Sequence, residues 1–130
     1  MGISQFEETL TDSYAARFPT DAGASFGSIS TDIAYARRVD QIIVVSNDPL
    51  PIPISLSVSL ANSATAFLGT VIIPALAGSD GTTPPVDLLP TIIPTLTNIL
   101  LDRTDTVQID FPASASVGNY LWVYTLAGRF

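Results

Sequence analysis

The side chains that could carry chemistry in this sequence are few, and most of them are carboxylates. The chain of 130 residues holds twelve Asp and Glu and five Arg, with no His, Cys or Lys. The most common general base and the thiol nucleophile are therefore missing, and so is Schiff-base chemistry. A nucleophilic serine would lack its usual activating base. We therefore predict that the protein is not an enzyme.

The carboxylates do not form a recognisable catalytic or metal-binding pattern. Asp102 and Asp105 lie close together in the segment Asp-Arg-Thr-Asp, and Asp110 follows. Two-carboxylate hydrolysis needs a nearby pair with one raised pKa, but aspartates in a turn usually bond their own backbone. Asp80 and Asp87 do not match the spacing of an EF-hand. We predict neither a metal nor a cofactor.

The stretch ALAGSDGTTPPVDLL, residues 75–89, raises the question of a ligand-binding loop. A phosphate loop would need the pattern G-x-x-x-x-G-K-[ST] and a cation, and the stretch has neither. Its glycines supply backbone freedom, its aspartate supplies turn bonding, and its prolines stiffen the exit. We predict a shaped corner that braces a protein–protein contact through Gly78, Asp80, Gly81, Pro84 and Pro85.

Charge and composition limit the partners. The net charge is −7, and no basic stripe exists that would neutralise phosphates, so we predict no nucleic-acid partner. Anionic lipid is disfavoured for the same reason, and prolines interrupt the longest uncharged stretch, so we predict no membrane partner. Only 13% of residues are charged while 47% are hydrophobic. Solubility then depends on Ser, Thr and Asp, or on burying surface in an assembly.

The pattern from residue 39 onward is that of short β-strands. Residues 54–60, ISLSVSL, alternate strictly between apolar and serine side chains. Further strands are predicted over residues 39–46, 65–73, 106–111 and 120–126, and one or two helical turns after Pro84-Pro85. No alternation of strands and helices suggests a parallel sheet. The predicted fold is all-β: an antiparallel β-sandwich or jelly-roll-like domain over residues 39–130.

Residues 1–38 differ and are predicted to form a mostly non-β N-terminal arm. Ser4 and Glu7 match a capping box. Phe6, Leu10 and Tyr14 then follow one helical face, which predicts a short helix over residues 4–17. Two interpretations stay open: a helix folded back on the domain, or an arm that reaches a neighbouring subunit.

The last strand carries the most aromatic run, YLWVYTL. Tyr120, Trp122 and Tyr124 fall on one face, and Leu121 and Val123 fall on the other. Because both faces are apolar, the strand is expected to be central or buried by a partner. The candidate interface residues are the following: Phe6, Leu10, Tyr14, Arg37, Arg38, Tyr120, Trp122 and Tyr124. An aromatic row of this kind also suits sugar binding, so a carbohydrate- or host-receptor-binding β-sandwich module of a phage tail or cell surface is the alternative function.

The order of these features resembles a known class of proteins. A Ser-rich alternating strand leads into FLGTVIIPALAG, then a loop of the form G-x-D-G-T-x-P-P-V-D-L-L, then LDRTDTVQIDFPA and the terminal GNYLWVYTLAG. Over residues 39–130 this resembles small virion proteins of tailed bacteriophages, in particular capsid decoration (cement) proteins with a jelly-roll-like fold.

The resemblance implies a non-enzymatic structural role. Cement proteins commonly sit as trimers on the shell and clamp neighbouring capsid subunits, so the implied partners are the major capsid protein and copies of this chain in a homotrimer. The implied location is the capsid exterior of a virion assembled in the host cytoplasm. Residues 1–38 would grip the shell.

Overall fold

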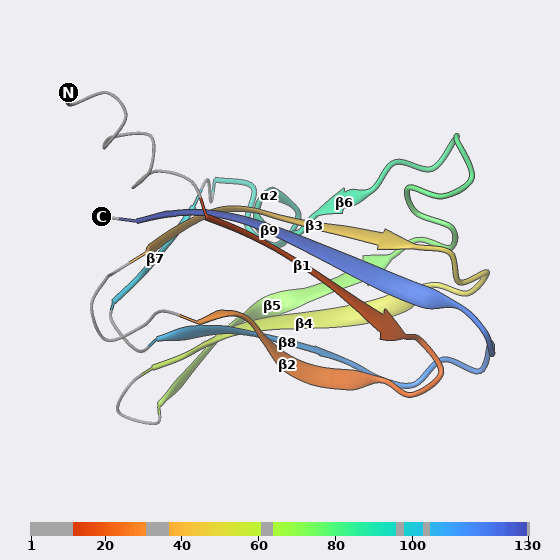
Figure 1. The fold of residues 1–130 in the computed structure, drawn as a ribbon, viewed down its shortest axis with the longest axis horizontal. Coiled ribbons are helices and arrows are strands. Elements are labelled where there is room, and N and C mark those ends of the chain that lie inside the picture. Colours follow the sequence, from red (N-terminus) through yellow and green to blue (C-terminus); the bar gives the residue numbers. More distant parts are fainter. Residues whose placement is uncertain (1–11, 31–36, 61–63, 96–97, 103–104, 130) are drawn as a thin grey trace.

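The computed structural model describes residues 12–30, 37–60, 64–95, 98–102 and 105–129, which form two packed antiparallel sheets (Figure 1). The elements in chain order are β1 (Asp12–Pro19), β2 (Ala24–Ser30), β3 (Arg37–Ser46), β4 (Ile52–Ser59), β5 (Thr65–Ile73), β6 (Val86–Asp87), α2 (Leu88–Ile92), β7 (Ile99–Leu101), β8 (Thr106–Phe111) and β9 (Tyr120–Arg129). Within this part of the chain, no helix has the length and apolar character needed to cross a membrane.

The strand order is that of a jelly roll. Sheet A has the order β1-β9-β3-β6, with β7 also pairing with β3, and sheet B has the order β2-β8-β4-β5. Every pair is antiparallel. Successive strands mostly alternate between the two sheets, which produces the interlocked Greek keys of a double-sheet jelly roll. The predicted all-β antiparallel sandwich is confirmed.

The alternating residues of the two sheets form the core between them. In β8, Val107, Ile109 and Phe111 are buried while the residues between them are half-exposed. The inward residues of β4, such as Ile54 and Leu56, are fully buried. Burying one such side chain stabilises the fold by about 1.5–3 kcal/mol. The short helix α2 adds two buried leucines, and it contacts both β3 and β5, so it closes one open side of the sandwich.

The predicted non-β arm is wrong for residues 12–30. All of β1 pairs with β9, from Asp12 opposite Ala127 to Pro19 opposite Tyr120, and β2 pairs with β8. The predicted division at residue 38 therefore does not separate these strands from the sandwich. The helical spacing that ends at Tyr14 is overridden because a neighbouring strand offers a full ladder of backbone hydrogen bonds. The part of the predicted helix that precedes residue 12 lies outside the described residues.

Four connections meet at one end of the sandwich, on the right in Figure 1: residues 20–23, 47–51, 74–85 and 112–119. The segment 74–85 is the longest connection within the described chain, and it runs from β5 in sheet B to β6 in sheet A. The stretch that the sequence marked as a shaped corner is therefore a crossing between the two sheets.

Candidate functional site

The outer face of sheet A carries a row of large apolar side chains. Strand β9 lies between β1 and β3, so it is central, which is one of the two positions expected for it. Its residues Leu121 and Val123 are buried in the core. The residues between and beyond them face outward, and the cross-strand neighbours on β3 continue the row. We call the following six residues the sheet-A strip: Tyr120, Trp122, Tyr124 and Leu126 of β9, with Ile43 and Val45 of β3.

The strip is open to solvent in part. The side chain of Tyr124 is 44% exposed and that of Leu126 is 38% exposed, while Trp122 is half-buried. Ile43 lies opposite Tyr124, and Val45 lies opposite Trp122. Directly opposed side chains on one sheet face are in contact range. The strip is therefore a continuous apolar surface and not a set of isolated residues.

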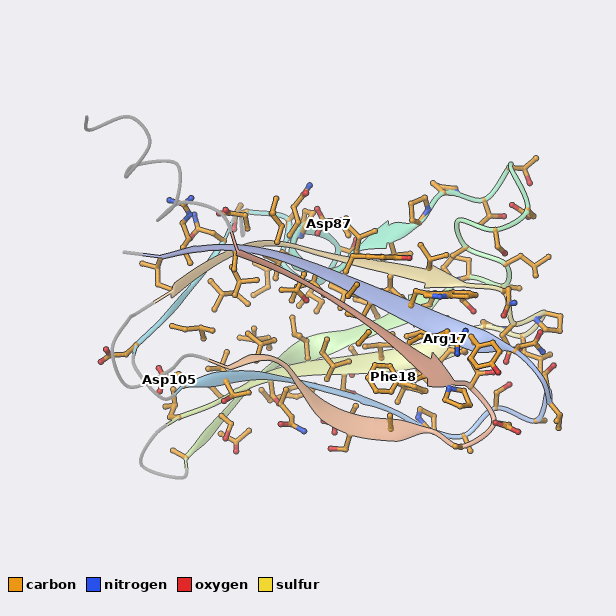
Figure 2. All side chains as sticks on the ribbon, viewed as in Figure 1. Arg17, Phe18, Asp87 and Asp105 are labelled. Atoms are coloured by element: carbon orange, nitrogen blue, oxygen red, sulfur yellow. The ribbon has the colours of Figure 1, made fainter. Side chains whose placement is uncertain are left out.

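Arg17 of β1 supplies a positive charge at one end of the strip. It lies opposite Trp122 in the β1–β9 register, and its guanidinium carbon is 4.5 Å from the centroid of the Tyr120 ring. A position over an aromatic face attracts a cation through the negative face of the ring. Figure 2 shows Arg17 beside Phe18, which lies between the two sheets. Arg17 was not among the predicted site residues, because the β1–β9 pairing that places it there is not visible in the sequence.

The outer face of sheet B is different in character. It is lined by small polar side chains: Ser55 and Thr70 are hydrogen-bonded at 3.1 Å, and Gln108 Nε2 donates to Ser25 Oγ at 2.9 Å. Two large apolar residues, Phe67 and Ile72, are exposed on the edge strand β5. The sandwich thus has one aromatic-apolar face and one mainly hydroxyl-bearing face.

The loop 74–85 is held in shape by Asp80. Its Oδ1 accepts hydrogen bonds from the amides of Thr82 at 2.9 Å and Thr83 at 2.7 Å, and its Oδ2 accepts from the Thr83 hydroxyl at 2.9 Å. The Gly78 amide donates to the Thr83 carbonyl at 2.7 Å and closes the loop. Gly78 and Gly81 have φ of 77° and 80°, so both positions need the left-handed backbone that glycine allows.

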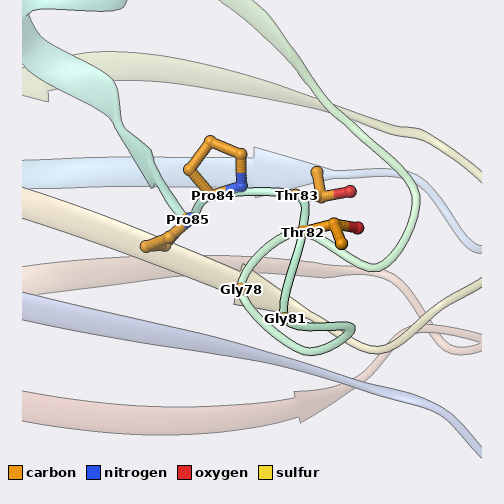
Figure 3. Close-up of a pocket in the computed structure, with 6 residues that line it drawn as sticks. All are labelled: Gly78, Gly81, Thr82, Thr83, Pro84 and Pro85. Carbon is orange, nitrogen blue, oxygen red and sulfur yellow. The ribbon is translucent and has the colours of Figure 1, made fainter.

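A small open hollow of about 330 Å³ lies within this loop (Figure 3). Its lining residues are Gly78, Gly81, Thr82, Thr83, Pro84 and Pro85. None of these side chains is charged, so the hollow offers no group that would neutralise a phosphate or hold a cation. It offers hydroxyl, backbone and proline surface, which suits contact with another polypeptide.

We expect the Asp80 turn to hold its shape down to very low pH. The Thr83 amide, the Thr82 amide and the Thr83 hydroxyl lower the pKa of Asp80 from 3.8 to about 2. Because this pKa is depressed, the turn is fully supported above pH 3.8 and loses that support as the pH falls through about 2. NMR titration of the Thr82 and Thr83 amide shifts measures the midpoint. A midpoint near pH 3.8 would show that the hydrogen bonds from Thr82 and Thr83 do not lower the pKa of Asp80. Asp80→Asn should abolish the titration.

The loop packs against the strip. A side-chain carbon at Gly78 would lie 3.1 Å from Val45 Cγ2 and 3.2 Å from Pro85 Cβ, so these groups are already in close contact. The Ser79 hydroxyl donates to the Ser46 carbonyl at 2.9 Å. The strip and the predicted loop residues therefore form one surface, which the sequence did not indicate.

The same end of the molecule is held together by Asp48. Asp48 is fully buried, its Oδ1 accepts from the Leu50 amide at 2.8 Å, and its carbonyl accepts from the Leu76 amide at 3.0 Å. Burial raises its pKa, but the hydroxyls of Thr20 and Ser114 and the Leu50 amide outweigh it, so the pKa of Asp48 lies below its ordinary value. Asp48 thus joins loops 47–51 and 74–85, while backbone hydrogen bonds from Thr20 to Asn119 and from Ser114 to Thr20 join loops 20–23 and 112–119.

The remaining predicted interface residues lie elsewhere. Arg38 is in β3 at the opposite end of sheet A, where its Nε donates to Asp40 Oδ1 at 2.7 Å. Its neighbour Arg37 pairs in register with Leu101 and Arg129. Tyr14 is in β1 opposite Thr125. The structure does not bring Arg37 or Arg38 together with the aromatic row, Tyr14 stands on the strand that pairs with β9, and Phe6 and Leu10 precede the described residues.

Of the acidic residues considered for chemistry, Asp102 and Asp105 are joined by a hydrogen bond within their turn. Asp105 Oδ2 accepts a hydrogen bond from the Asp102 amide at 3.1 Å, which is the expected turn bonding. Asp110 is in β8, opposite Ser25 and Ser55. Among the residues that the structure describes, no group of three or more carboxylates is arranged to hold a metal ion.

Fold and surface together define a jelly-roll β-sandwich with an apolar outer sheet face and a braced loop beside it. No protein-family model matches the sequence. No curated protein matches it in sequence. One chain of the solved structure "Structure of infectious bursal disease virus Gx strain" is similar over 92% of this chain, with 13% sequence identity and a TM-score of 0.39. This chain spans 32% of the length of that one.

Proposed function

We propose that this protein is a non-enzymatic structural protein of a virus particle, and more closely a capsid cement (decoration) protein that binds coat subunits and copies of itself. The observation that carries the proposal is the sheet-A strip. Jelly rolls occur in viral capsid and lectin domains, among others, so the fold permits this function without deciding it.

The composition of the strip favours contact with protein. Interfaces are enriched in Tyr, Trp and Arg and depleted in Asp and Glu. The strip combines Tyr120, Trp122 and Tyr124 with the stacked Arg17 and contains no acid, although the chain has twelve. Asp87 stands at its border, opposite Ile43. Contiguous exposed apolar surface of this kind marks an interaction site.

The adjoining loop strengthens the proposal. Loop 74–85 is closed by Asp80 and anchored to Ser46 and Asp48, so it loses little freedom when a partner binds. A rigid projecting loop beside an apolar face gives the contact surface a defined shape in addition to apolar area. A shell protein that clamps several neighbours at once gains further from avidity.

Replacing Leu126 with aspartate should weaken assembly. The new carboxylate would lie within a desolvated contact, and we expect self-association to fall at least about tenfold. Light scattering and sedimentation across a concentration series measure the effect. Ile72→Asp is the matched control, because Ile72 is also an exposed aliphatic residue on an outer sheet face, but in sheet B. If Leu126→Asp and Ile72→Asp both self-associate as strongly as the parent protein, the proposal is overturned.

The aromatic row favours one other function, carbohydrate binding. Tyr120 and Trp122 have ring centroids 6.1 Å apart and lie on an open face, as stacking platforms for sugars do. Trp122 is the single tryptophan, so its fluorescence reports on this face directly. A saturable change with added sugar would support this second candidate; an unchanged spectrum across a panel of neutral and acidic sugars would exclude it.

A further inference from the structure

Loop 74–85 projects from the same side of the molecule that carries the sheet-A strip. Its base lies on the outward side chain of Val45, because a side-chain carbon at Gly78 would be 3.1 Å from Val45 Cγ2. Figure 1 shows the loop rising past sheet A on the side that faces away from sheet B. Residues 80–82 at the tip are exposed, and a side-chain carbon at Gly81 would meet nothing within 4 Å. One face therefore carries an apolar strip and a projecting loop beside it.

Hydrogen bonds hold the tip of this loop away from the strip of its own molecule. At the base, the Ser79 hydroxyl donates to the Ser46 carbonyl at 2.9 Å, and the Leu76 amide donates to the Asp48 carbonyl at 3.0 Å. At the tip, Asp80 accepts three hydrogen bonds from within the loop. Folding the tip down across sheet A would break these bonds. The occupant of the strip is therefore another molecule.

The exposed proline of the loop suits the aromatic part of the strip. Pro84 is exposed, and its ring is apolar with no amide hydrogen beside it. Proline-rich segments bind surfaces lined with aromatic rings. In the strip, the Tyr120 ring is covered by the guanidinium of Arg17 and Trp122 is half-buried, whereas Tyr124 is 44% exposed. Tyr124 therefore offers the most open ring to a proline.

The charges of the loop tip and the strip are also complementary. Asp80 is exposed at the tip, and its carboxylate accepts three hydrogen bonds out of about four that such a group can accept. Arg17 is exposed beside the strip, opposite Trp122, and the strip itself contains no acid. A loop placed on the strip of another copy brings the carboxylate and the guanidinium together, which fixes the register of the contact.

We infer that loop 74–85 of one copy binds the sheet-A strip of a second copy of this chain, with Pro84 on the ring of Tyr124 and Asp80 beside Arg17. This inference rests on the proposed function and names the partner at that site. Because loop and strip are neighbours on one face, a copy whose loop lies on the strip turns its own strip toward the first copy's loop. The contact is therefore reciprocal, as in a two-fold dimer. The homotrimer implied by the resemblance to cement proteins would need a head-to-tail contact instead.

Disulfide formation between introduced cysteines tests the contact. The chain has no cysteine of its own. Thr82→Cys lies at the exposed loop tip, and Ala15→Cys lies at an exposed position of β1 opposite Tyr124, so neither variant removes a side chain that the contact uses. Full-length chains of the two variants are mixed and mildly oxidised.

We expect mixed dimers at a yield at least about tenfold above that of the control mixture, because a disulfide forms only where the Cα atoms approach within about 7 Å. The control mixture combines Thr82→Cys with Thr70→Cys, since Thr70 is exposed on the outer face of sheet B. Equal yields would overturn the inference.

Placing Thr82→Cys and Ala15→Cys in one chain tests the reciprocal arrangement. A reciprocal contact closes both disulfides within one pair of copies, so we expect covalent dimers without longer multimers. Covalent trimers or a ladder of longer multimers would show a head-to-tail contact. Monomers with an internal disulfide would show that the loop reaches its own strip. Either result would overturn the inference.

Light scattering then distinguishes this inference from the proposed function. Pro84→Asp places a carboxylate against the aromatic row and changes no core residue, and we expect it to weaken self-association at least about tenfold. Val117→Asp is the matched control, because Val117 is a 78% exposed apolar residue in the neighbouring loop 112–119, and it should leave association unchanged.

The combined results separate the two proposals. If Leu126→Asp weakens association and Pro84→Asp does not, or if Val117→Asp weakens it as much as Pro84→Asp does, the loop is not the partner, while the assembly function stands. If Pro84→Asp alone weakens association, the loop binds a surface other than the strip, and the inference fails. If neither Leu126→Asp nor Pro84→Asp changes association, both proposals fail.

Discussion

Replacing Asp48 with alanine is expected to lower the free energy of unfolding by about 2–4 kcal/mol, because hydrogen bonds to a buried charged group are worth more than neutral ones. The substitution removes the side-chain acceptor of the Leu50 amide, which would then lose its partner. Urea unfolding followed by Trp122 fluorescence measures the loss.

The same carboxylate makes the loop end sensitive to acid. The pKa of Asp48 is lowered from its ordinary value of 3.8, so its contribution is fully present above that pH. The contribution disappears as the pH falls through the lower value of the folded protein. Asp48→Ala should therefore lose less stability relative to the parent in strong acid than at neutral pH.

Asp110→Ala is the control for both effects. Asp110 is half-buried on the outer face of sheet B, so its replacement should change stability by less than about 0.5 kcal/mol. If Asp110→Ala and Asp48→Ala cost the same at neutral pH, Asp48 does not join the loops as described.

Replacing Gly23 with alanine is expected to cost about 2–4 kcal/mol, through backbone strain and overpacking together. Gly23 has a φ of 66°, and a side-chain carbon there would lie 2.8 Å from the Ala113 nitrogen and 3.0 Å from the Phe111 carbonyl oxygen. Both neighbours are backbone atoms, one in the last residue of β8 and one in the loop after it, so neither can rotate away. The turn between β1 and β2 would have to move off the loop 112–119.

Gly81→Ala distinguishes the cost of backbone strain from the cost of overpacking. Gly81 has a φ of 80°, but a side-chain carbon there meets nothing within 4 Å, so its replacement should cost only about 1–2 kcal/mol of backbone strain. Thermal unfolding of both variants gives the comparison. Equal losses would show that the close approach of Gly23 to residues 111–113 does not contribute.

Both predictions concern the end of the sandwich that supports the proposed contact surface. Backbone hydrogen bonds of Thr20 join residues 20–23 to residues 112–119, and loop 74–85 is bonded to Ser46 and Asp48. Variants that loosen this end should therefore also weaken assembly, even though Asp48 is buried and Gly23 does not lie on the strip.

Much of the fold could be predicted because β alternation is a local property. The strands expected over residues 65–73 and 106–111 have those bounds, and the strand expected from residue 54 begins at Ile52. The alternation of YLWVYTL correctly separated Leu121 and Val123 from the outward aromatic row. The turn role of Asp80 was also visible, because an aspartate next to glycine in a loop usually bonds the backbone that follows it.

The features that the sequence did not indicate have a common cause, because each depends on contacts between segments far apart in the chain. Residues 24–30 carry too little apolar mass to indicate a strand by themselves, yet they pair with β8 more than 75 positions away. Arg17 and Trp122 are neighbours through the same kind of distant pairing. Asp48 stands between Asn47 and Pro49, a combination typical of an ordinary turn, and its burial depends on where the neighbouring loops lie.

By itself, the sequence determined the β class, the core faces of the later strands, the lack of histidine, cysteine and lysine chemistry, and the shape of the Asp80 turn. These follow from the period of side chains along a strand and from residue types, which need no knowledge of distant segments. The tertiary structure decided that residues 12–30 belong to the sandwich, that Arg17 stacks on the aromatic row, and that this row adjoins loop 74–85. Those outcomes depend on the register between strands far apart in the sequence, and register is set by the cooperative packing of both sheets.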